Sequence, residues 1–368
     1  MSDSIRILHV LGKLDLAGTE TFVMNIYRNI NKSKLQFDFV VHGDEVGDYE
    51  KEIKDLGGNI YRVPKYNVIN NLEYKYWWKN FFKEHPQYKV IHCHIRSTAS
   101  IILKVAKEYK LITIAHSHSI SNGKGINAMI KNFNQRNINP FADYKLACSE
   151  KAGNWLFGEK EDFKVIKNAI PVEKFMFSNS KRGSFRKSYN IENKLVYGHI
   201  GRFTKEKNHL FLIESFKYIS QKNSNAILML VGRGPLEEKV KSKILSYGLT
   251  NKVIFLGLQE DISSFMSGID IFIFPSLYEG LGIVLIEAQA SGLPCFVSEK
   301  IPEEAMLTKL VTSYPIQNAK EFANISEIKI DNRNYAENRK MYNKTIKDSG
   351  FDCIETSIYM ENFYTNLY

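Results

Sequence analysis

Cysteine is scarce in this chain of 368 residues, which holds only four, far apart and without a Cys-x-x-Cys pair. That usage excludes a disulfide-stapled scaffold, offers no zinc-site spacing and fits a reducing compartment. No stretch approaches about 18 uninterrupted apolar residues, so no membrane-spanning helix is expected. The first ten residues, MSDSIRILHV, lack the long apolar segment of a signal peptide. A cytoplasmic protein is therefore expected, either free or peripheral at the inner face of the cell membrane.

Acidic residues are in the minority, since 50 Lys and Arg against 40 Asp and Glu leave a formal net charge of +10. This surplus favours an anionic partner, such as a nucleotide, a nucleic acid or an anionic membrane leaflet, without choosing among them. No Asp-x-Asp sequence occurs, so the commonest carboxylate signature of a magnesium–diphosphate site is missing. Hydrophobic residues at 44% and charged residues at 24% are ordinary for a globular protein and exclude a fibre or a disordered tail.

The chain length predicts about two domains. Short runs rich in Val and Ile, apolar on both faces, alternate with amphipathic stretches of helix length, which is typical of parallel strands covered by helices on both sides. The runs are Ile5–Val10, Phe37–Val41, Ile60–Val63, Val90–His92, Ile112–Ala115 and Lys145–Ala147, then Leu195–Ile200, Ile227–Val231, Val253–Leu256, Ile271–Phe274 and Cys295–Val297. Two such series predict an α/β protein with two doubly wound, Rossmann-like domains.

The domain boundaries follow from the gap between the two series. We predict a first domain of residues 1–165 and a second of residues 166–347. Residues 348–368 are predicted to form a helix that returns to the first domain, with Ile354, Ile358, Tyr359 and Phe363 on its packing face. The segment Phe175–Asn193, which contains KRGSFRK and little apolar periodicity, is predicted to be an exposed basic loop.

Polar and glycine-rich segments follow the apolar runs in both halves. In the first half they are GKLDLAGTE, HCHIRS and AHSHS, and in the second GRFTKEKN, GRGP, GLQED and PSLYEGLG. Ligands of open parallel sheets bind beyond the carboxyl ends of the strands. We therefore expect a ligand site at that edge of each sheet.

The segment Pro275–Pro294 combines a strand end, a tight turn and a helix start. The N-terminus of a helix beginning near Gly282 suits a phosphate group. Carboxylates do not suit a phosphate, so Glu279 and Glu287 would accept hydrogen bonds from hydroxyl groups. The alternative is that Glu279 only complements the helix dipole and that Glu287 is solvated.

Two cations, Arg202 and Lys207, follow the strand that ends at Ile200, next to Gly201. At about 4 Å from a diphosphate, each would contribute roughly a few kcal/mol at an intermediate dielectric. Such a pair would stabilise a departing nucleoside diphosphate without a metal ion. The alternative is two surface cations in a lysine-rich loop.

Two His-x-His pairs occur, His92/His94 and His116/His118. Their imidazoles are structural, contact a substrate or bind zinc, although no accompanying carboxylate ligand is found. Five aromatic residues also recur at helical spacing, with lysines on another face. This stripe is either core or an interfacial membrane face, and consists of Tyr74, Trp77, Trp78, Phe81 and Phe82.

The motifs of the second half resemble glycosyltransferase family 4, retaining nucleotide-sugar enzymes with the GT-B fold. The resemblance rests on Glu279-x7-Glu287, preceded by Phe274-Pro275-Ser276 and accompanied by Gly201-Arg202…Lys207-Asn208, Val231-Gly232-Arg-Gly234-Pro235 and Phe255-Leu256-Gly257. It runs almost end to end through residues 165–297. The first half matches more loosely, through Ala17-Gly18-Thr19-Glu20, the His92-x-His94 segment and Ala115-His116-Ser117-His118. The subgroup that it resembles most builds bacterial capsule or exopolysaccharide.

The resemblance implies a role for each matching residue. Glu279 would hold hydroxyls of the transferred sugar, and Glu287 those of the ribose. Arg202 and Lys207, beside Gly201, would neutralise the diphosphate. Backbone N–H groups of residues 281–283 (Leu281, Gly282 and Ile283), with Gly18 from the first domain, would complete the phosphate cradle. His116 would hydrogen-bond the donor sugar.

The implied reaction moves a sugar from a nucleotide-sugar, UDP-sugar in our prediction, to a lipid-linked or oligosaccharide acceptor, with no metal ion and no nucleic acid. The chain departs from the family at Ala17, where glycine is usual, and at Pro171, where the common Asn-Gly-Ile/Val-Asp has lost its Asp. The alternatives are a GT-B phosphorylase, a sugar-nucleotide epimerase, and a basic module that binds nucleic acid or anionic lipid.

Overall fold

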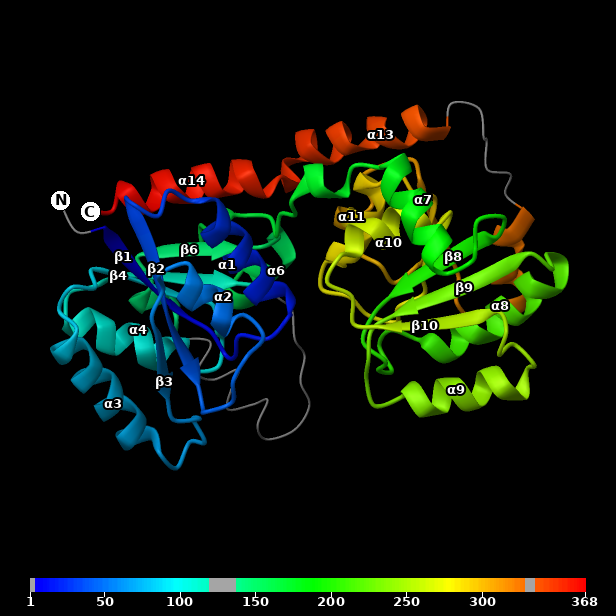
Figure 1. The fold of residues 1–368 in the computed structure, drawn as a ribbon. Coiled ribbons are helices and arrows are strands. Elements are labelled where there is room, and N and C mark those ends of the chain that lie inside the picture. The colour runs from blue at the N-terminus through cyan, green and yellow to red at the C-terminus, as the bar shows by residue number, and fades with distance from the viewer. Residues whose placement is uncertain (1–3, 119–136, 328–334) are drawn as a thin grey trace. The chain divides into compact units, whose positions relative to one another are not determined.

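The computed structural model describes residues 4–118, 137–327 and 335–368. They form two compact units (Figure 1). The first unit comprises Met1–Ala169 and Asp352–Tyr368, and the second comprises Ile170–Phe351. Both crossings between the units therefore lie a few residues beyond the boundaries placed from the sequence.

The first unit is built on a parallel sheet of seven strands in the order β3-β2-β1-β4-β5-β6-β7. The strands are β1 Ile5–Val10, β2 Leu35–His42, β3 Ile60–Val63, β4 Val90–Cys93, β5 Ile112–Ser117, β6 Tyr144–Ala147 and β7 Lys164–Val165. The helices are α1 Gly18–Asn29, α2 Glu50–Asp55, α3 Asn71–Glu84, α4 Ala99–Glu108, α6 Glu150–Phe157 and α14 Cys353–Thr365. The order of the strands reverses between β1 and β4, which are neighbours in the sheet.

The second unit repeats this plan with a parallel sheet of six strands in the order β10-β9-β8-β11-β12-β13. The strands are β8 Leu195–Ile200, β9 Ala226–Val231, β10 Val253–Gly257, β11 Ile271–Phe274, β12 Cys295–Ser298 and β13 Val311–Tyr314. The helices are α7 Asn179–Ser188, α8 His209–Lys222, α9 Glu237–Ser246, α10 Ile262–Gly268, α11 Ile283–Ala290, α12 Ala319–Phe322 and α13 Tyr335–Ile346. Here the order reverses between β8 and β11.

Each sheet carries a hydrophobic cluster on both faces. In the first unit, α1 and α14 cover one face and α3, α4 and α6 the other. In the second unit, α8, α9 and α12 cover one face, and α7, α10 and α11 the other. The predicted pair of doubly wound α/β domains is therefore confirmed. The short edge strands β7 and β13 went unpredicted, because β7 has only two residues and β13 is largely exposed.

The prediction of an exposed basic loop at 175–193 is wrong. Most of that segment forms α7, whose N-cap Ser178 accepts a hydrogen bond from the backbone N–H of Lys181. Arg182 and Arg186 turn inward and pair with Asp270 at 2.6 and 3.1 Å. A buried carboxylate therefore converts an apparently solvated basic run into a packed helix.

The returning helix α14 packs on α1 of the first unit, but part of its predicted packing face is wrong. Ile354 and Ile358 are 46% and 58% exposed. The helix instead buries Met360 and Tyr364. A hydrogen bond supports this placement, since the side chain of Glu361 accepts from the backbone N–H of Asn31 at 2.8 Å.

The aromatic stripe of α3 belongs to the core of the first unit. Tyr74, Trp78, Phe81 and Phe82 are buried against the sheet and α4, and Trp77 packs at their edge. Of the two interpretations, core packing is therefore confirmed for this face of the helix. Within the described ranges, no helix combines the length and the apolar character that crossing a bilayer requires.

Candidate active site

The loops after β8 and β11 meet at the carboxyl edge of the second sheet, where the strand order reverses. The backbone N–H of Leu277 donates to the carbonyl of Glu206 at 2.7 Å, and the side-chain amide of Asn208 donates to the carbonyl of Pro275 at 3.2 Å. The loop that carries Arg202 and Lys207 is thus fastened to the loop that carries Glu279. A strand reversal of this kind is where ligands of doubly wound folds bind.

Two glycines allow the loop after β9 to touch the loop after β8. A Cβ on Gly232, whose φ is +133°, would lie 2.2 Å from the carbonyl oxygen of Gly201. A Cβ on Gly234 would lie 2.7 Å from the backbone nitrogen of Phe203. Any side chain at either position would push the two loops apart. The two glycines of the Gly-Arg-Gly-Pro motif therefore allow these loops to pack closely at the carboxyl edge of the sheet.

Lys207 and Glu279 are brought into direct contact. The Nζ of Lys207 lies 2.6 Å from Oε1 of Glu279, and the two side chains are only 24% and 10% exposed. The ammonium group also lies 5.1 Å from the ring centroid of Phe274, at the end of β11. The other predicted cation, Arg202, is exposed on the same loop.

The helix α11 begins directly after this pair. Its N-cap is Gly282, which has a φ of +82° and no side chain with which to cap the helix. The first N–H groups of an α-helix have no intrahelical acceptor. The backbone around Leu281 and Ile283 therefore offers donors and a positive dipole end close to Lys207 and Glu279.

Glu287 lies one turn into α11 and is mostly buried. Burial raises the pKa of its carboxyl group from 4.5 to about 8, a rise that the charge of Lys174 partly opposes. The interpretation of Glu287 as a solvated helix residue is therefore wrong. A buried carboxyl group at this place is suited to hydrogen bonding with hydroxyl groups.

We expect the substitution Glu287→Gln to make protein stability less dependent on pH. A carboxyl pKa raised in the folded state contributes stability that is complete below about pH 4.5 and is lost as the pH rises through about 8. The variant should match the wild type at about pH 4.5 and exceed it by about 4–5 kcal/mol at about pH 9 in urea unfolding. Exposed Glu355→Gln serves as the control, and an equal stability difference at both pH values would contradict the assignment.

At the carboxyl edge of the first sheet, five histidines come together from three strands and the residues that follow them. His9 and His92 are register partners on β1 and β4. Three ring nitrogen pairs are in hydrogen-bond contact: His92 Nε2 with His116 Nδ1 at 3.2 Å, His9 Nδ1 with His94 Nε2 at 2.9 Å, and His94 Nδ1 with His118 Nε2 at 2.8 Å. Exposed Gly18, the first residue of α1, follows the loop after β1.

The histidine cluster is largely buried and uncharged. His9, His92, His94 and His116 are at least nine-tenths buried, and burial lowers the pKa of each imidazole, to about 3 for His9. Two groups in the described residues have nitrogens close enough for one metal ion: His9, His92 and His94, and His94, His116 and His118. The two His-x-His pairs therefore form one cluster. Its geometry is compatible with a structural, a ligand-contacting and a metal-binding role.

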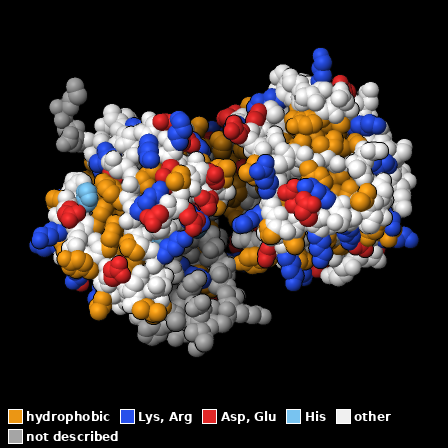
Figure 2. Space-filling view, turned by 60° about the horizontal axis from the view of Figure 1, so that its bottom comes forward, with side chains coloured by type: hydrophobic (Ala, Val, Ile, Leu, Met, Phe, Trp, Pro, Cys, Tyr) orange, Lys and Arg blue, Asp and Glu red, His pale blue; other side chains and the backbone are white. Residues whose placement is uncertain are grey.

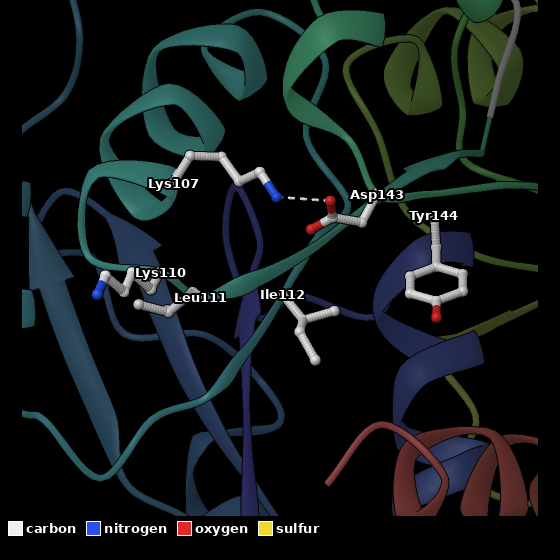
Figure 3. A pocket seen from close by; sticks show the side chains of 6 residues that line it. All are labelled: Lys107, Lys110, Leu111, Ile112, Asp143 and Tyr144. Atoms are coloured by element: carbon white, nitrogen blue, oxygen red, sulfur yellow. Dashed lines mark hydrogen bonds and ion pairs between the residues drawn. The ribbon is translucent and has the colours of Figure 1, made fainter.

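A separate hollow of about 610 Å³ lies at the opposite, amino edge of the first sheet (Figure 3). Its lining includes Lys107 and Asp143, which pair at 2.5 Å, together with Lys110, Leu111, Ile112 and Tyr144. The carboxylate of Asp143 is also occupied by the backbone and hydroxyl of Thr113. This hollow is remote from the loops that end the strands and contains none of the predicted site residues.

Comparison with known proteins gives the family. EpsF of Bacillus subtilis (strain 168), itself named as a glycosyltransferase, is 35% identical over 330 residues, which cover 86% of each chain. The chain belongs to glycosyltransferase family 4. Residues 181–348 of this glycosyltransferase match the family model described as glycosyl transferases group 1. A galactosyltransferase of Escherichia coli, named for transfer from UDP-Gal to α-D-GlcNAc-diphosphoundecaprenol, is 32% identical over 147 residues, 39% of this chain and 38% of its own.

Solved structures agree on the architecture. HepE from Anabaena, in complex with UDP and glucose, superimposes with a TM-score of 0.79 over 98% of this glycosyltransferase and 99% of its own chain, at 19% identity. At that identity the likeness concerns the fold, which is GT-B: two Rossmann-like domains, as the resemblance implied.

The structure groups most predicted site residues by unit. Gly201, Arg202, Lys207 and Glu279 lie at one edge of the second sheet, with α11 and Glu287 beside them. Gly18 and His116 lie at the corresponding edge of the first sheet. The sequence patterns did not identify two residues that contact this cluster. They are His9, which contacts His94, and Tyr364, which contacts His92. The signal for His9 was a polar residue between the apolar Leu8 and Val10, whereas Tyr364 is remote in sequence and left none.

Proposed function

We propose that this glycosyltransferase transfers a sugar, with retention of anomeric configuration, from a UDP-sugar to a lipid-linked glycan in the synthesis of capsule or exopolysaccharide. The observation that carries the proposal is the Lys207–Glu279 pair at the N-terminus of α11. It sets a cation, a hydroxyl acceptor and free N–H groups side by side, as a sugar diphosphate requires. The UDP bound by HepE and the lipid diphosphate in the name of the E. coli relative support the donor and acceptor.

In this proposal the second unit holds the donor. Lys207 and Arg202 neutralise the diphosphate, assisted by the N–H groups of residues 281–283 and Gly18. When the diphosphate draws Lys207 away, the freed carboxylate of Glu279 accepts hydrogen bonds from the sugar. Glu287 accepts from the ribose hydroxyls, and His116 contacts the sugar from the first unit. Binding thereby exchanges an internal ion pair for two substrate contacts.

The proposed chemistry needs no protein nucleophile. The bond between the anomeric carbon and the diphosphate oxygen breaks, and the acceptor hydroxyl forms its bond to that carbon on the same face. The departing diphosphate oxygen takes the proton of the hydroxyl. Arg202 and Lys207 stabilise the charge that develops on the leaving group, so electrostatics and positioning supply the catalysis.

The test is transfer from UDP-, GDP- and ADP-sugars to a polyprenyl-diphosphate-linked sugar, with the product anomer determined by NMR. We expect a UDP-sugar to be used, with retention, and with full activity in the presence of EDTA. Inversion would refute the mechanism. Loss of activity in EDTA, restored by a divalent ion, would refute metal independence. A preference for GDP- or ADP-sugars would refute the base assignment.

We also propose where the enzyme contacts an anionic membrane. The face of α3 opposite its buried stripe exposes Leu72 at 81% and Tyr76 at 67%, and Ile69, in the turn just before the helix, is 95% exposed. Lys79 and Lys83 fall on the same helical face, since they lie seven and eleven residues after Leu72. Hydrophobic side chains interspersed with Lys and Arg are visible on the first unit in Figure 2. We call Ile69, Leu72 and Tyr76 the apolar tip. Exposed apolar side chains followed by lysines suit an anionic lipid surface.

The turn before α3 that carries Ile69 is closed by two hydrogen bonds. Asn67 and Asn70 exchange hydrogen bonds between side-chain oxygen and backbone N–H at 2.9 and 3.0 Å. Between them Val68 adopts a φ of +71°, an unfavourable conformation for a β-branched residue. The turn thus keeps an unfavourable backbone conformation next to apolar side chains that are exposed to solvent, and such strain is typical of a functional surface.

We expect the double substitution Ile69→Ser and Leu72→Ser to weaken binding to vesicles containing phosphatidylglycerol by about tenfold or more. Thermal stability should not change, because both side chains are exposed. Leu245→Ser, at a 72% exposed leucine of α9 in the second unit, is the matched control. Equal binding by the double variant and the control, measured by vesicle sedimentation, would rule out this face.

A further inference from the structure

The histidine cluster contains a hydrogen-bonded chain that ends in a tyrosine of the last helix. The hydroxyl of Tyr364 lies 2.6 Å from Nδ1 of His92, and Nε2 of His92 lies 3.2 Å from Nδ1 of His116. Tyr364 and His92 have no exposed surface, and His116 has 2%. A residue near the end of the sequence is therefore joined, through one imidazole, to the predicted sugar contact of the first unit.

All three groups are uncharged. Burial and the neighbouring histidines hold the pKa of His92 and His116 well below the ordinary value, and burial raises the pKa of Tyr364 well above its own. A neutral imidazole has one N–H and one lone pair, and a phenol has one O–H. Each link in the chain therefore has one donor and one acceptor, and fixing one link fixes the next.

The tyrosine fixes the direction of the chain. If the phenol donates to Nδ1 of His92, then His92 carries its proton on Nε2 and donates to Nδ1 of His116. In the reverse direction the phenol only accepts, and its O–H has no acceptor among the residues that the structure describes. A buried donor without a partner is costly. The 2.6 Å separation also fits an O–H donor better than an N–H donor.

The consequence falls on the far side of His116. With Nδ1 accepting from His92, the proton of His116 lies on Nε2, a buried atom with no partner in the described part of the chain. That nitrogen is therefore a neutral N–H donor, which suits a sugar hydroxyl or phosphate oxygen. His116 cannot bind a metal ion through Nε2 unless the direction of the hydrogen-bonded chain reverses, which would leave the O–H of Tyr364 without an acceptor. The geometry thus favours an oxygen ligand over a metal at His116.

We propose that Tyr364 and His92 are positioning residues that keep the proton of His116 on Nε2, so that His116 donates a hydrogen bond to an oxygen of the donor substrate. The identity of that substrate rests on the function proposed above. The tautomer does not, because it is a property of the free protein.

The first measurement is two-bond ¹H–¹⁵N NMR of the full chain labelled with ¹⁵N-histidine, at neutral pH and without ligand. The signals of His116 are identified by their loss in His116→Gln. We expect a protonated Nε2 and an unprotonated Nδ1. A proton on Nδ1, a doubly protonated ring, or a metal ion bound at Nε2 would overturn the proposal, whether or not the protein transfers sugar.

The second measurement compares single substitutions within the chain with a control substitution on the same helix. Tyr364→Phe should shift His116 toward a mixture of tautomers and lower kcat/KM for the donor by about tenfold. Tyr359→Phe, which removes a partly buried hydroxyl from the same helix, is the control and should change neither. His92→Gln keeps an N–H donor near the position of Nε2 and should retain more activity than His92→Leu. An unchanged His116 spectrum in Tyr364→Phe would overturn the role of the tyrosine.

Discussion

Glu279→Gln is expected to lower kcat/KM for sugar transfer by about 10²–10³-fold, while the free energy of unfolding changes by no more than about 1 kcal/mol. The carboxylate lies at the start of α11, 2.6 Å from Lys207, where a charged acceptor binds sugar hydroxyls more strongly than a neutral amide does. Glutamine has the same shape, so the loss isolates the charge. Stopped assays of nucleoside diphosphate release give the rate, and urea unfolding gives the stability.

The control for this prediction is Glu206→Gln. Glu206 is an exposed carboxylate on the adjoining loop, and it contacts the Glu279 loop only through its backbone carbonyl. Its substitution should leave transfer unchanged. Undiminished transfer by Glu279→Gln would remove the central assignment of the proposed mechanism, whatever the behaviour of the control.

Lys207→Met is expected to lower kcat/KM by a comparable factor, about 10²–10³-fold, since one cation near a diphosphate contributes a few kcal/mol at an effective dielectric of about 20. Because Lys207 would act on the diphosphate, which UDP also carries, the substitution should weaken the binding of UDP. The Kd of UDP should rise by about tenfold or more. Isothermal titration with UDP measures the binding, and donor turnover measures the rate. A normal Kd together with a normal rate would show that Lys207 only partners Glu279.

Exposed Lys205 on the same loop provides the matched control, because Lys205→Met removes the same charge from the same segment. The double variant Lys207→Met, Glu279→Gln completes a cycle. Because the two side chains form one ion pair, their effects on transfer should fall short of additive. Fully additive effects would mean that the pair does not act as a unit during catalysis.

The fold was largely predictable because both sheets are buried on both faces. Continuous apolar runs such as Ile271–Phe274 have few alternatives to a parallel strand, and the alternation of runs with amphipathic segments determines the doubly wound plan. The start of α11 was predictable for a similar reason, since Gly282 adopts a conformation that glycine favours. Family motifs then assigned roles that spacing alone left open.

What escaped prediction depended on partners distant in sequence. Arg182 and Arg186 look solvated until Asp270 is placed beside them, more than eighty residues later in the chain. The packing face of α14 was misjudged because Ile354 and Ile358 obey helical spacing as well as Met360 and Tyr364 do. Hydrophobic periodicity predicts a helix, but it does not tell which face meets the core when both faces carry apolar side chains.

The placement of α14 makes the first unit depend on residues that follow the whole second unit in the chain. Met360 and Tyr364 belong to the hydrophobic cluster that α1 forms with the first sheet, so that cluster stays open while they remain within the ribosome. The second unit is continuous in sequence and needs no such contribution. The first unit begins the chain but cannot complete its core before the second unit has been synthesised, and a stop codon ahead of Cys353 would therefore damage the N-terminal lobe.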